Sequence, residues 1–249
     1  MTFETRTVAA EFDMRDDTTT GAPVFEGYAS VFNQPYDMGP FWEQVDRRAF
    51  DRTLSLGPDV RLLIDHEGQP LARTKSGTLT LRTDDHGLHV HAPLDPSDPD
   101  VQRLLPKMRR GDLSEMSFAF RVPTGGDEWD YSTDRTMRTL RELSLQGGDV
   151  SVVTYPASPT TSASLRSKDL REARCVFIEQ AARSIREGRS LSPENLAKLR
   201  AVLDEVLPAS EAPEVAEAIE EQQAQPVARG RSLDLAKRLM AAADARLGQ

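Results

Sequence analysis

The first two thirds of the chain contain short segments in which apolar and polar residues alternate or in which apolar residues form a brief run. These segments are residues 25–32, 78–82, 88–92, 116–122 and 149–155. A period of two is typical of strands, and a short apolar run between turn residues is typical of a buried strand. The segment 83–87 ends in glycine and has a turn composition, so residues 78–92 are predicted to form a β-hairpin.

Helical spacing is found in two short segments of this region, residues 48–56 and 98–110, and it dominates the C-terminal third. In that third, one apolar stripe repeats every three or four residues and consists of Leu170, Ala173, Phe177, Ala181 and Ile185. Ser192, Pro193 and Glu194 then form a helix start with an N-cap, a proline and an acid in the first turn. A last helix is predicted at residues 233–247. The pattern therefore predicts an α+β protein with a helical C-terminal tail.

Composition divides the same chain into two parts. The chain has nine Phe, four Tyr and two Trp, and beyond residue 166 the only aromatic residue is Phe177. A stretch rich in Pro, Ser and Thr at residues 156–164 separates the parts, as is typical of a boundary. We therefore expect a strand-rich domain at residues 1–166 and a helical, partly flexible interaction tail at residues 167–249.

Charge and cysteine content exclude several classes of protein. The 249 residues carry a net charge of −9, which argues against a nucleic-acid-binding protein with a basic face. The single cysteine cannot form an internal disulfide or a zinc site of several thiolates. No apolar stretch is long enough to span a membrane, and the N-terminal residues do not resemble a signal peptide. We expect no cofactor.

His66 is a candidate for acid–base chemistry. It follows the apolar run 62–64, lies between Asp65 and Glu67, and precedes Gly68 and Pro70, which predict a turn. Chemical groups are often presented where strands end at loops. The alternative from this segment alone is a surface histidine at the end of a strand.

Two serines and one acid are candidate partners for this histidine. Ser114 lies three residues after Gly111, a position that is explained by a turn cap, whereas Ser117 lies within an apolar strand and needs a hydrogen-bond partner if it is buried. A histidine base would be such a partner and would activate the hydroxyl. Asp149 begins an apolar strand, where it either orients a histidine or bonds to nearby backbone.

Other residue patterns give less support to a specific chemistry. His89 and His91 are two residues apart and share one face of a predicted strand, but no third metal ligand has a suitable spacing. A metal hydrolase that uses His66, His89 and His91 is therefore a weaker hypothesis. The sequence contains no Gly-x-Ser-x-Gly elbow, Walker A motif or His-Glu-x-x-His motif.

Six segments in this order resemble the phage prohead (capsid maturation) protease family. They are residues 25–33 with Tyr36 and Asp37, residues 43–45 with Ala49 and Phe50, residues 63–67 with residues 70–73, residues 79–81 with residues 85–88, residues 111–120 and residues 149–157. Together they extend over most of residues 22–160, and they do not include the tail.

The resemblance implies a serine endopeptidase on a herpesvirus assemblin-like fold, which is mainly an antiparallel β-barrel with surrounding helices. The family's histidine, serine and acid correspond to His66, Ser117 and Asp149. The sequence departs from the family pattern at residues 145–148, where two extra residues precede the acid, so Glu142 competes with Asp149 for the third position. A second hypothesis is a non-catalytic capsid assembly or scaffolding protein on the same fold.

The resemblance also implies the partners and the location. The expected substrates are the scaffold protein, or the scaffold segment of the major capsid protein, inside the immature prohead in the cytoplasm of a bacterial host. We expect the tail to act like a scaffold or packaging signal, with self-association as a further contact and self-cleavage near residues 157–170. No membrane or nucleic-acid partner is expected.

Overall fold

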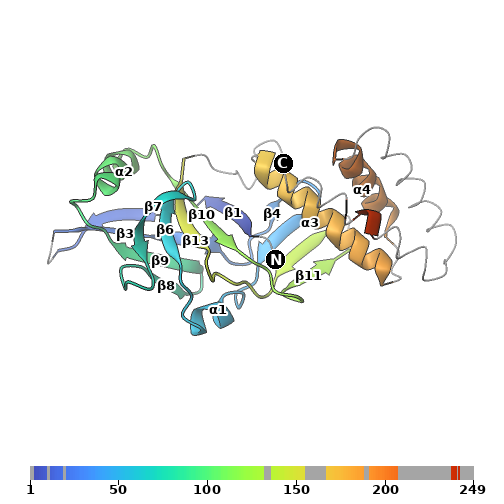
Figure 1. The fold of residues 1–249 in the computed structure, drawn as a ribbon, viewed down its shortest axis with the longest axis horizontal. Helices are drawn as coiled ribbons and strands as arrows, with labels where there is room; N and C mark the ends of the chain where they lie inside the picture. Colours follow the sequence, from blue (N-terminus) through green and yellow to red (C-terminus); the bar gives the residue numbers. More distant parts are fainter. Residues whose placement is uncertain are drawn as a thin grey trace. The chain divides into compact units, whose positions relative to one another are not determined.

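The computed structural model describes residues 3–9, 12–18, 21–131, 136–154, 167–187, 191–206, 237–239 and 241. Within these residues the chain forms thirteen strands and four helices of an α+β fold (Figure 1). The contacts divide the chain into two compact units. The first is Met1–Asp37, Glu43–Trp129 and Arg138–Arg166, and the second is Met38–Trp42, Asp130–Met137 and Ser167–Gln249.

The strands form three sheets. The first has the order β1 (Glu4–Ala9), β10 (Glu115–Phe120), β13 (Asp149–Val153), β6 (Arg61–Ile64) and β7 (Glu67–Arg73). The second has the order β2 (Phe12–Asp16), β3 (Pro23–Val31), β9 (Gly87–Pro93) and β8 (Thr80–Thr83). The third has the order β11 (Asp127–Asp130), β12 (Met137–Leu140), β5 (Trp42–Val45) and β4 (Tyr36–Asp37). The α+β class is confirmed, but the described strands do not form a closed barrel, so the predicted barrel is unconfirmed.

The strands predicted from alternation are present as β3, β8, β9, β10 and β13. The predicted hairpin is also confirmed, because β8 pairs antiparallel with β9 and Leu81 lies opposite Val90. The sequence patterns did not predict β1 and β2, whose residues carry many charges and hydroxyls. Burial in the first unit, rather than local apolar content, explains why β1 is a strand.

The core of the first unit lies against one face of its five-stranded sheet. Met116, Phe118 and Phe120 on β10, and Val150 and Val152 on β13, belong to one buried apolar cluster. The rings of Phe118 and Phe120 are stacked, with centroids 4.9 Å apart. Each such side chain contributes about 1.5–3 kcal/mol when it is fully buried. Because side chains alternate along a strand, this packing directs Ser117 and Ser151 to the opposite face.

Two helices flank the strands of this unit, and both were predicted. α1 (Asp51–Ser55) is shorter than the predicted segment 48–56. α2 (Pro99–Arg109) buries Val101, Leu104 and Met108, and it begins at Asp98, whose Oδ1 accepts a hydrogen bond from the backbone N–H of Asp100 at 2.8 Å. The chain after α2 turns at Gly111, where φ is +76° and a side chain would be strained.

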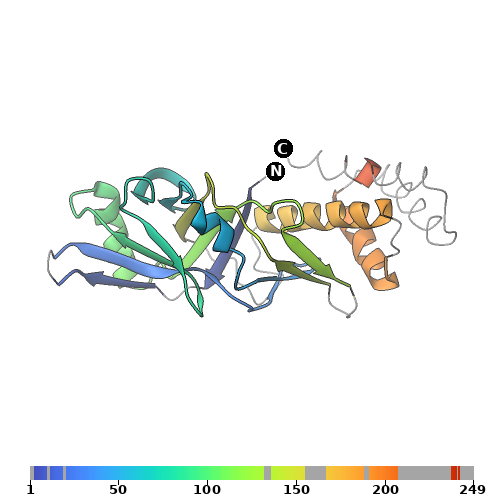
Figure 2. The same cartoon turned by 90° about the horizontal axis from the view of Figure 1, so that it is seen from below.

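The second unit contains α3 (Ser167–Arg186) and α4 (Pro193–Val206), which lie side by side in Figures 1 and 2. The predicted stripe is buried at Ala173, Phe177, Ala181 and Ile185. None of the described helices is long and apolar enough to cross a membrane.

Two further contacts involve short segments of the second unit that precede its helices in the sequence. The ring of Phe41 is stacked with that of Phe177, with centroids 6.4 Å apart. The hydroxyl of Thr136 donates to Asn195 Oδ1 at 2.6 Å, and the predicted cap is confirmed because the Asn195 N–H donates to Ser192 Oγ at 3.2 Å. The second unit therefore packs residues from before and after position 166.

Several predictions fall on residues that the structure does not describe. These are the boundary stretch 156–164 and the expected cleavage region up to residue 166. Of the predicted last helix at residues 233–247, residues 237–239 and 241 are described, and they are helical.

A cluster of buried charges connects β1 with β5 and β12. The Arg138 guanidinium donates to Glu4 Oε2 at 2.7 Å and to Glu43 Oε2 at 2.9 Å, and Arg6 donates to the same two carboxylate oxygens at 2.6 and 3.0 Å. The hydroxyl of Tyr36 donates to Glu43 Oε1 at 2.7 Å. The four charged residues are each at most 7% exposed. This ionic cluster therefore anchors the edge strand β1 to β5 and β12.

The ionisation of the cluster follows from its pairing. Burial raises the pKa of Glu4, but the Arg138 and Arg6 guanidinium groups outweigh this effect and lower that pKa to about 2. Burial and the neighbouring Glu43 carboxylate raise the pKa of Tyr36 well above its usual value. Glu4 is thus a carboxylate and Tyr36 a neutral hydrogen-bond donor at neutral pH.

Removal of one buried partner should be much more costly than removal of an exposed one. We expect Arg138→Met to lower the free energy of unfolding by about 3–5 kcal/mol, because it leaves two buried carboxylates with Arg6 as their one remaining guanidinium partner among the described residues. Arg141 is a matched control just after β12, since it pairs with Asp46 and Glu128 at the surface. Arg141→Met should cost about 1 kcal/mol or less. Urea unfolding of both variants measures the difference, and equal losses would contradict the role of the cluster.

Candidate active site

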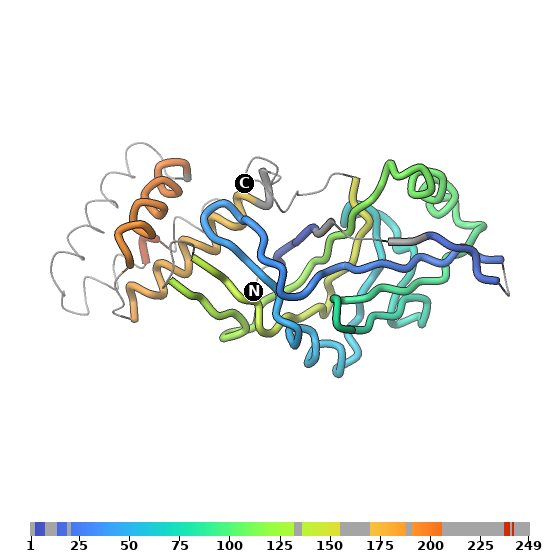
Figure 3. The backbone as a smooth tube through the Cα atoms, turned by 180° about the vertical axis from the view of Figure 1, so that it is seen from behind, coloured from blue at the N-terminus to red at the C-terminus, as the bar shows by residue number. Residues whose placement is uncertain are grey.

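The candidate residues lie on two adjacent strands of the five-stranded sheet, β10 and β13, and just after the end of a third, β6 (Figures 1 and 3). Ser117 on β10 lies opposite Ser151 on β13, and Ser151 lies beside Leu63 on β6. Asp149 is two residues before Ser151, so its side chain shares the face of Ser151 and Ser117. The pairing of β13 with β6 is parallel, and it places the end of β6 beside Val152, the residue after Ser151.

His66 lies in the two-residue turn between β6 and β7. Asp65 has φ +50° and His66 has φ +63°, which are the left-handed angles that a tight hairpin turn of this length needs. The sequence predicted a turn after His66, at Gly68 and Pro70, but those residues lie in β7. The prediction was wrong because the tight turn is made by Asp and His, which adopt left-handed angles more readily than most residues.

The turn is held by hydrogen bonds to β13 and the residue after it. The backbone N–H of Asp65 donates to the Val152 carbonyl at 2.9 Å. The Asp65 carboxylate accepts from the Thr154 N–H at 2.8 Å and from the Thr154 hydroxyl at 2.5 Å. A left-handed non-glycine residue costs of the order of 1–3 kcal/mol, and these bonds offset that cost. The backbone of His66 is therefore fixed in place.

Three of the predicted residues form one chain of hydrogen bonds. His66 Nδ1 is 2.6 Å from Asp149 Oδ1, and His66 Nε2 is 2.7 Å from Ser117 Oγ. Asp149 carries no proton to donate as a carboxylate, so Nδ1–H donates to it and Nε2 is left to accept from the serine hydroxyl. The side chains of His66 and Asp149 are 20% and 14% exposed. This arrangement is suited to transfer of a proton from the serine to the histidine.

Ser117 is fully buried in this structure. Its neighbour on the outer side is β1, in which Thr7 lies opposite Ser117. The Ser117 hydroxyl has a second acceptor there, because its Oγ is 3.0 Å from the Arg6 carbonyl oxygen. The Arg6 carbonyl of β1 thus competes with His66 Nε2 for the proton of the Ser117 hydroxyl.

Ser151 was not among the residues selected from the sequence. Its Oγ donates to Asp149 Oδ1 at 2.6 Å, accepts from the backbone N–H of His66 at 3.2 Å, and is 3.4 Å from His66 Nδ1. The available signal was the spacing of Asp149 and Ser151, which puts two polar side chains on one face of an otherwise apolar strand.

The competing candidates lie elsewhere. Ser114 is exposed and precedes β10. Glu142 accepts a hydrogen bond from Arg52 at 2.9 Å, on a side chain that is 35% exposed. The structure thus gives His66 the acid Asp149 and not Glu142.

The other histidines have different partners. His89 accepts from Arg82 Nε at 3.3 Å and lies edge-on to Tyr28, and burial together with Arg82 lowers its pKa. His91 faces Glu26 at 3.8 Å. Among the described residues, no group of three or more His, Cys, Asp and Glu side chains could hold a metal ion. The geometry therefore gives no support to a metal site at His66, His89 and His91.

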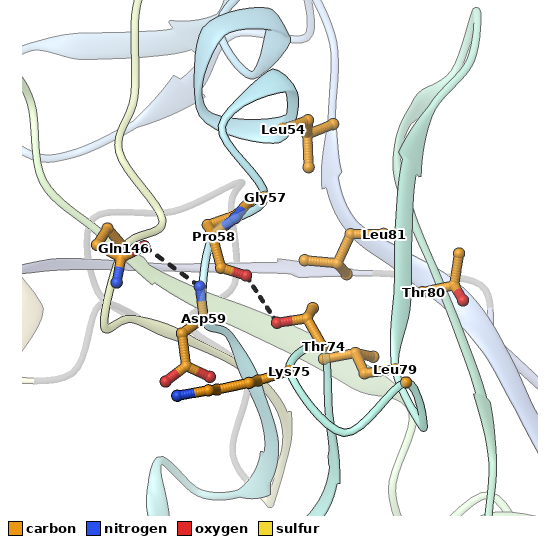
Figure 4. A pocket seen from close by; sticks show the side chains of 11 residues that line it. Leu54, Gly57, Pro58, Asp59, Thr74, Lys75, Leu79, Thr80, Leu81 and Gln146 are labelled. Atoms are coloured by element: carbon orange, nitrogen blue, oxygen red, sulfur yellow. Dashed lines mark hydrogen bonds between the residues drawn. The ribbon is translucent and has the colours of Figure 1, made fainter.

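A groove of about 680 Å³ opens in the first unit, and its lining does not include His66, Ser117 or Asp149 (Figure 4). Leu54, Leu79 and Leu81 line it together with Asp59 and Lys75. The side chain of Gln146 accepts from the backbone N–H of Asp59 at 3.3 Å across its edge. The groove is thus separate from the hydrogen-bonded chain described above.

Comparison with known proteins gives one result. The family model described as the caudovirus prohead serine protease matches residues 10–174, which is well over half of the chain. No curated protein and no solved structure matches the chain. The matched residues include β6, β10 and β13, and with them His66, Ser117 and Asp149. The chain therefore belongs to the caudovirus prohead serine protease family.

Proposed function

We propose that the protein is a serine endopeptidase that uses Ser117 as nucleophile, His66 as general base and Asp149 to orient the histidine. The observation that carries the proposal is the continuous chain of two short hydrogen bonds from Ser117 through His66 to Asp149. Membership of a serine protease family supports the reaction class.

In the first half of the reaction, Ser117 Oγ attacks a peptide carbonyl carbon while its proton moves to His66 Nε2. Asp149 accepts the Nδ1–H bond and stabilises the imidazolium that forms. The tetrahedral intermediate then collapses, the C–N bond breaks, and His66 gives the proton to the leaving amine. An ester between Ser117 and the N-terminal part of the substrate remains.

In the second half, a water molecule attacks the ester carbonyl and gives a proton to the same nitrogen of His66. Collapse of this intermediate releases a carboxylic acid, and the proton returns to Ser117 Oγ. Apart from the substrate itself, only Ser117, His66 and water change their bonds, so this chemistry requires no cofactor.

Access to Ser117 sets a further condition for this function. The serine is fully buried, and the Arg6 carbonyl lies 3.0 Å from its hydroxyl oxygen. A substrate carbonyl must reach the same oxygen, so part of β1 has to move away from Ser117 before acylation. The ionic cluster opposes this movement because Glu4 and Arg6 belong to β1.

The proposed substrates are the scaffold protein or the scaffold segment of the major capsid protein, cleaved inside the immature prohead in the host cytoplasm. The family description, a prohead serine protease of caudoviruses, supports this assignment. Residues 167–249 lie mostly beyond the matched range, and we propose that they form a scaffold-like interaction segment. Self-cleavage between this segment and the protease is part of the same proposal.

Co-expression with the cognate capsid and scaffold proteins tests the function. We expect the capsid or scaffold protein to become shorter with the wild type and to stay intact with Ser117→Ala or His66→Ala, since each variant removes a group that changes its bonds. Intact-mass measurement of both proteins gives the result and also reports self-cleavage. Equal processing by the variants would reject the site, and no processing by any form would favour a non-catalytic assembly protein.

The identity of the acid is tested separately. We expect Asp149→Asn to lower kcat/KM by about 10³- to 10⁴-fold, because the histidine loses the partner that fixes its tautomer. Glu142→Gln is the matched control, since Glu142 pairs with Arg52 and not with His66. It should cleave at close to the wild-type rate. A large loss in Glu142→Gln with little loss in Asp149→Asn would reverse the assignment.

The cover over Ser117 is tested with a fluorophosphonate, which reacts with activated serine hydroxyls. We expect Glu4→Gln to increase the rate at which Ser117 is labelled, because it weakens the ion pairs that hold β1. Glu128→Gln is a suitable control, since Glu128 is an exposed acid that pairs with Arg141. Mass spectrometry of the labelled peptide gives the rates. Equal rates in the wild type and Glu4→Gln would show that β1 does not limit access.

A further inference from the structure

One buried hydroxyl links the acid of the site to the backbone that carries the histidine. Ser151 lies in the middle strand of the three, directly between Ser117 and Leu63, and its side chain is fully buried. Its Oγ contacts Asp149 Oδ1 at 2.6 Å and the backbone nitrogen of His66 at 3.2 Å. Ser151 therefore contacts both Asp149 and His66.

The directions of these hydrogen bonds follow from the atoms involved. A hydroxyl has one hydrogen and two lone pairs, and a carboxylate only accepts, so the Ser151 hydrogen is donated to Asp149. A lone pair of the same oxygen is then available to the backbone N–H of His66. A bond from a hydroxyl to a carboxylate is also among the stronger kinds of hydrogen bond. The Ser151 hydroxyl thus bonds to both the Asp149 carboxylate and the backbone N–H of His66.

The link acts on the oxygen that orients the imidazole. Asp149 Oδ1 accepts from His66 Nδ1 at 2.6 Å and from Ser151 Oγ at the same distance. A carboxylate held by two donors on one oxygen has little freedom to rotate about its χ angles. The backbone bond from Ser151 also supports His66 in its left-handed conformation, with φ +63°. The hydroxyl thus restrains the acid and the histidine toward each other.

We propose that Ser151 is a positioning residue that fixes the Asp149 carboxylate against His66 and thereby keeps His66 Nε2 directed at Ser117. This proposal rests on the proposed function for its effect on reactivity, but its geometric part does not. A merely structural role, in which the hydroxyl is bonded only because it is buried, predicts an effect on stability without an effect on His66.

The experiment compares two variants that differ only in the hydroxyl. Ser151→Thr and Ser151→Val have nearly the same shape, so both add the same bulk to β13, and only threonine retains the donor and acceptor. We expect Val to lower the fluorophosphonate labelling rate of Ser117 by about 10- to 100-fold relative to Thr, as for a small misplacement of reacting groups. Ser30→Ala is the control, since Ser30 is an equally buried strand serine whose hydroxyl makes no hydrogen bond within the described residues.

A second readout does not depend on catalysis. The proton shared by His66 Nδ1 and Asp149 gives a low-field resonance in the NMR spectrum of protein with ¹⁵N-labelled histidine, and we expect Ser151→Val to shift or broaden it while Ser151→Thr retains it. The proposal is supported if both the labelling rate and the resonance change in Val and not in Thr. It is overturned if Thr and Val give the same resonance, or if wild-type Ser117 is labelled and Thr and Val give the same labelling rate.

The two proposals fail in different ways. If wild-type Ser117 is not labelled under any condition, the proposed peptidase function fails, and the resonance alone still decides whether Ser151 positions His66. If the wild type is labelled and the Thr and Val variants do not differ, the peptidase function stands and the role of Ser151 is rejected. A thermal unfolding curve of each variant confirms that the proteins compared are folded.

Discussion

The parallel pairing of β13 with β6 is the constraint on which the candidate site depends. Strand β13 is hydrogen-bonded to β10 on one side and to β6 on the other, with Ser151 between Ser117 and Leu63. A shift by one residue in either pairing would turn Ser117 or Asp149 to the apolar face. The core residues on β10 and β13 oppose such a shift, because their burial would be lost at the same time. The same packing that stabilises the sheet therefore aligns the site.

The ionic cluster imposes a second constraint, because it holds β1 beside Ser117. Buried charges are stable only while each has its partners, so Glu4 and Arg6 hold β1 firmly beside β10. That strand also covers Ser117 and offers its hydroxyl a second acceptor. If Ser117 is the nucleophile and His66 its base, as proposed, their geometry is complete, while the Arg6 carbonyl occupies the position that a substrate carbonyl needs. Under the proposed function, the energy of the cluster is one of the factors that set how often the site opens.

The structure brings the three candidate residues together in one hydrogen-bonded chain, whereas their surroundings differ from the prediction. His66 was a candidate because it ends a strand, Ser117 and Asp149 because they are polar residues in apolar strands, and the resemblance chose this set. The turn at Asp65 and His66 was misplaced, since left-handed angles at non-glycine residues depend on contacts from β13 that are distant in the sequence. Strand β1 was missed for a related reason. Its polar residues form a strand because Glu43 and Arg138, far along the chain, pair with them.

The choice between Asp149 and Glu142 illustrates what three-dimensional register adds. The two acids are seven residues apart. Because of the extra residues at positions 145–148, the sequence alone did not decide which of them is the partner of His66. In the structure the backbone N–H of Gly148 bonds to the Leu145 carbonyl, so these residues form a turn before β13. An insertion in a turn leaves the register of the following strand unchanged. Asp149 therefore keeps its place two residues before Ser151, on the face that meets His66, whereas Glu142 lies before the turn, next to Arg52.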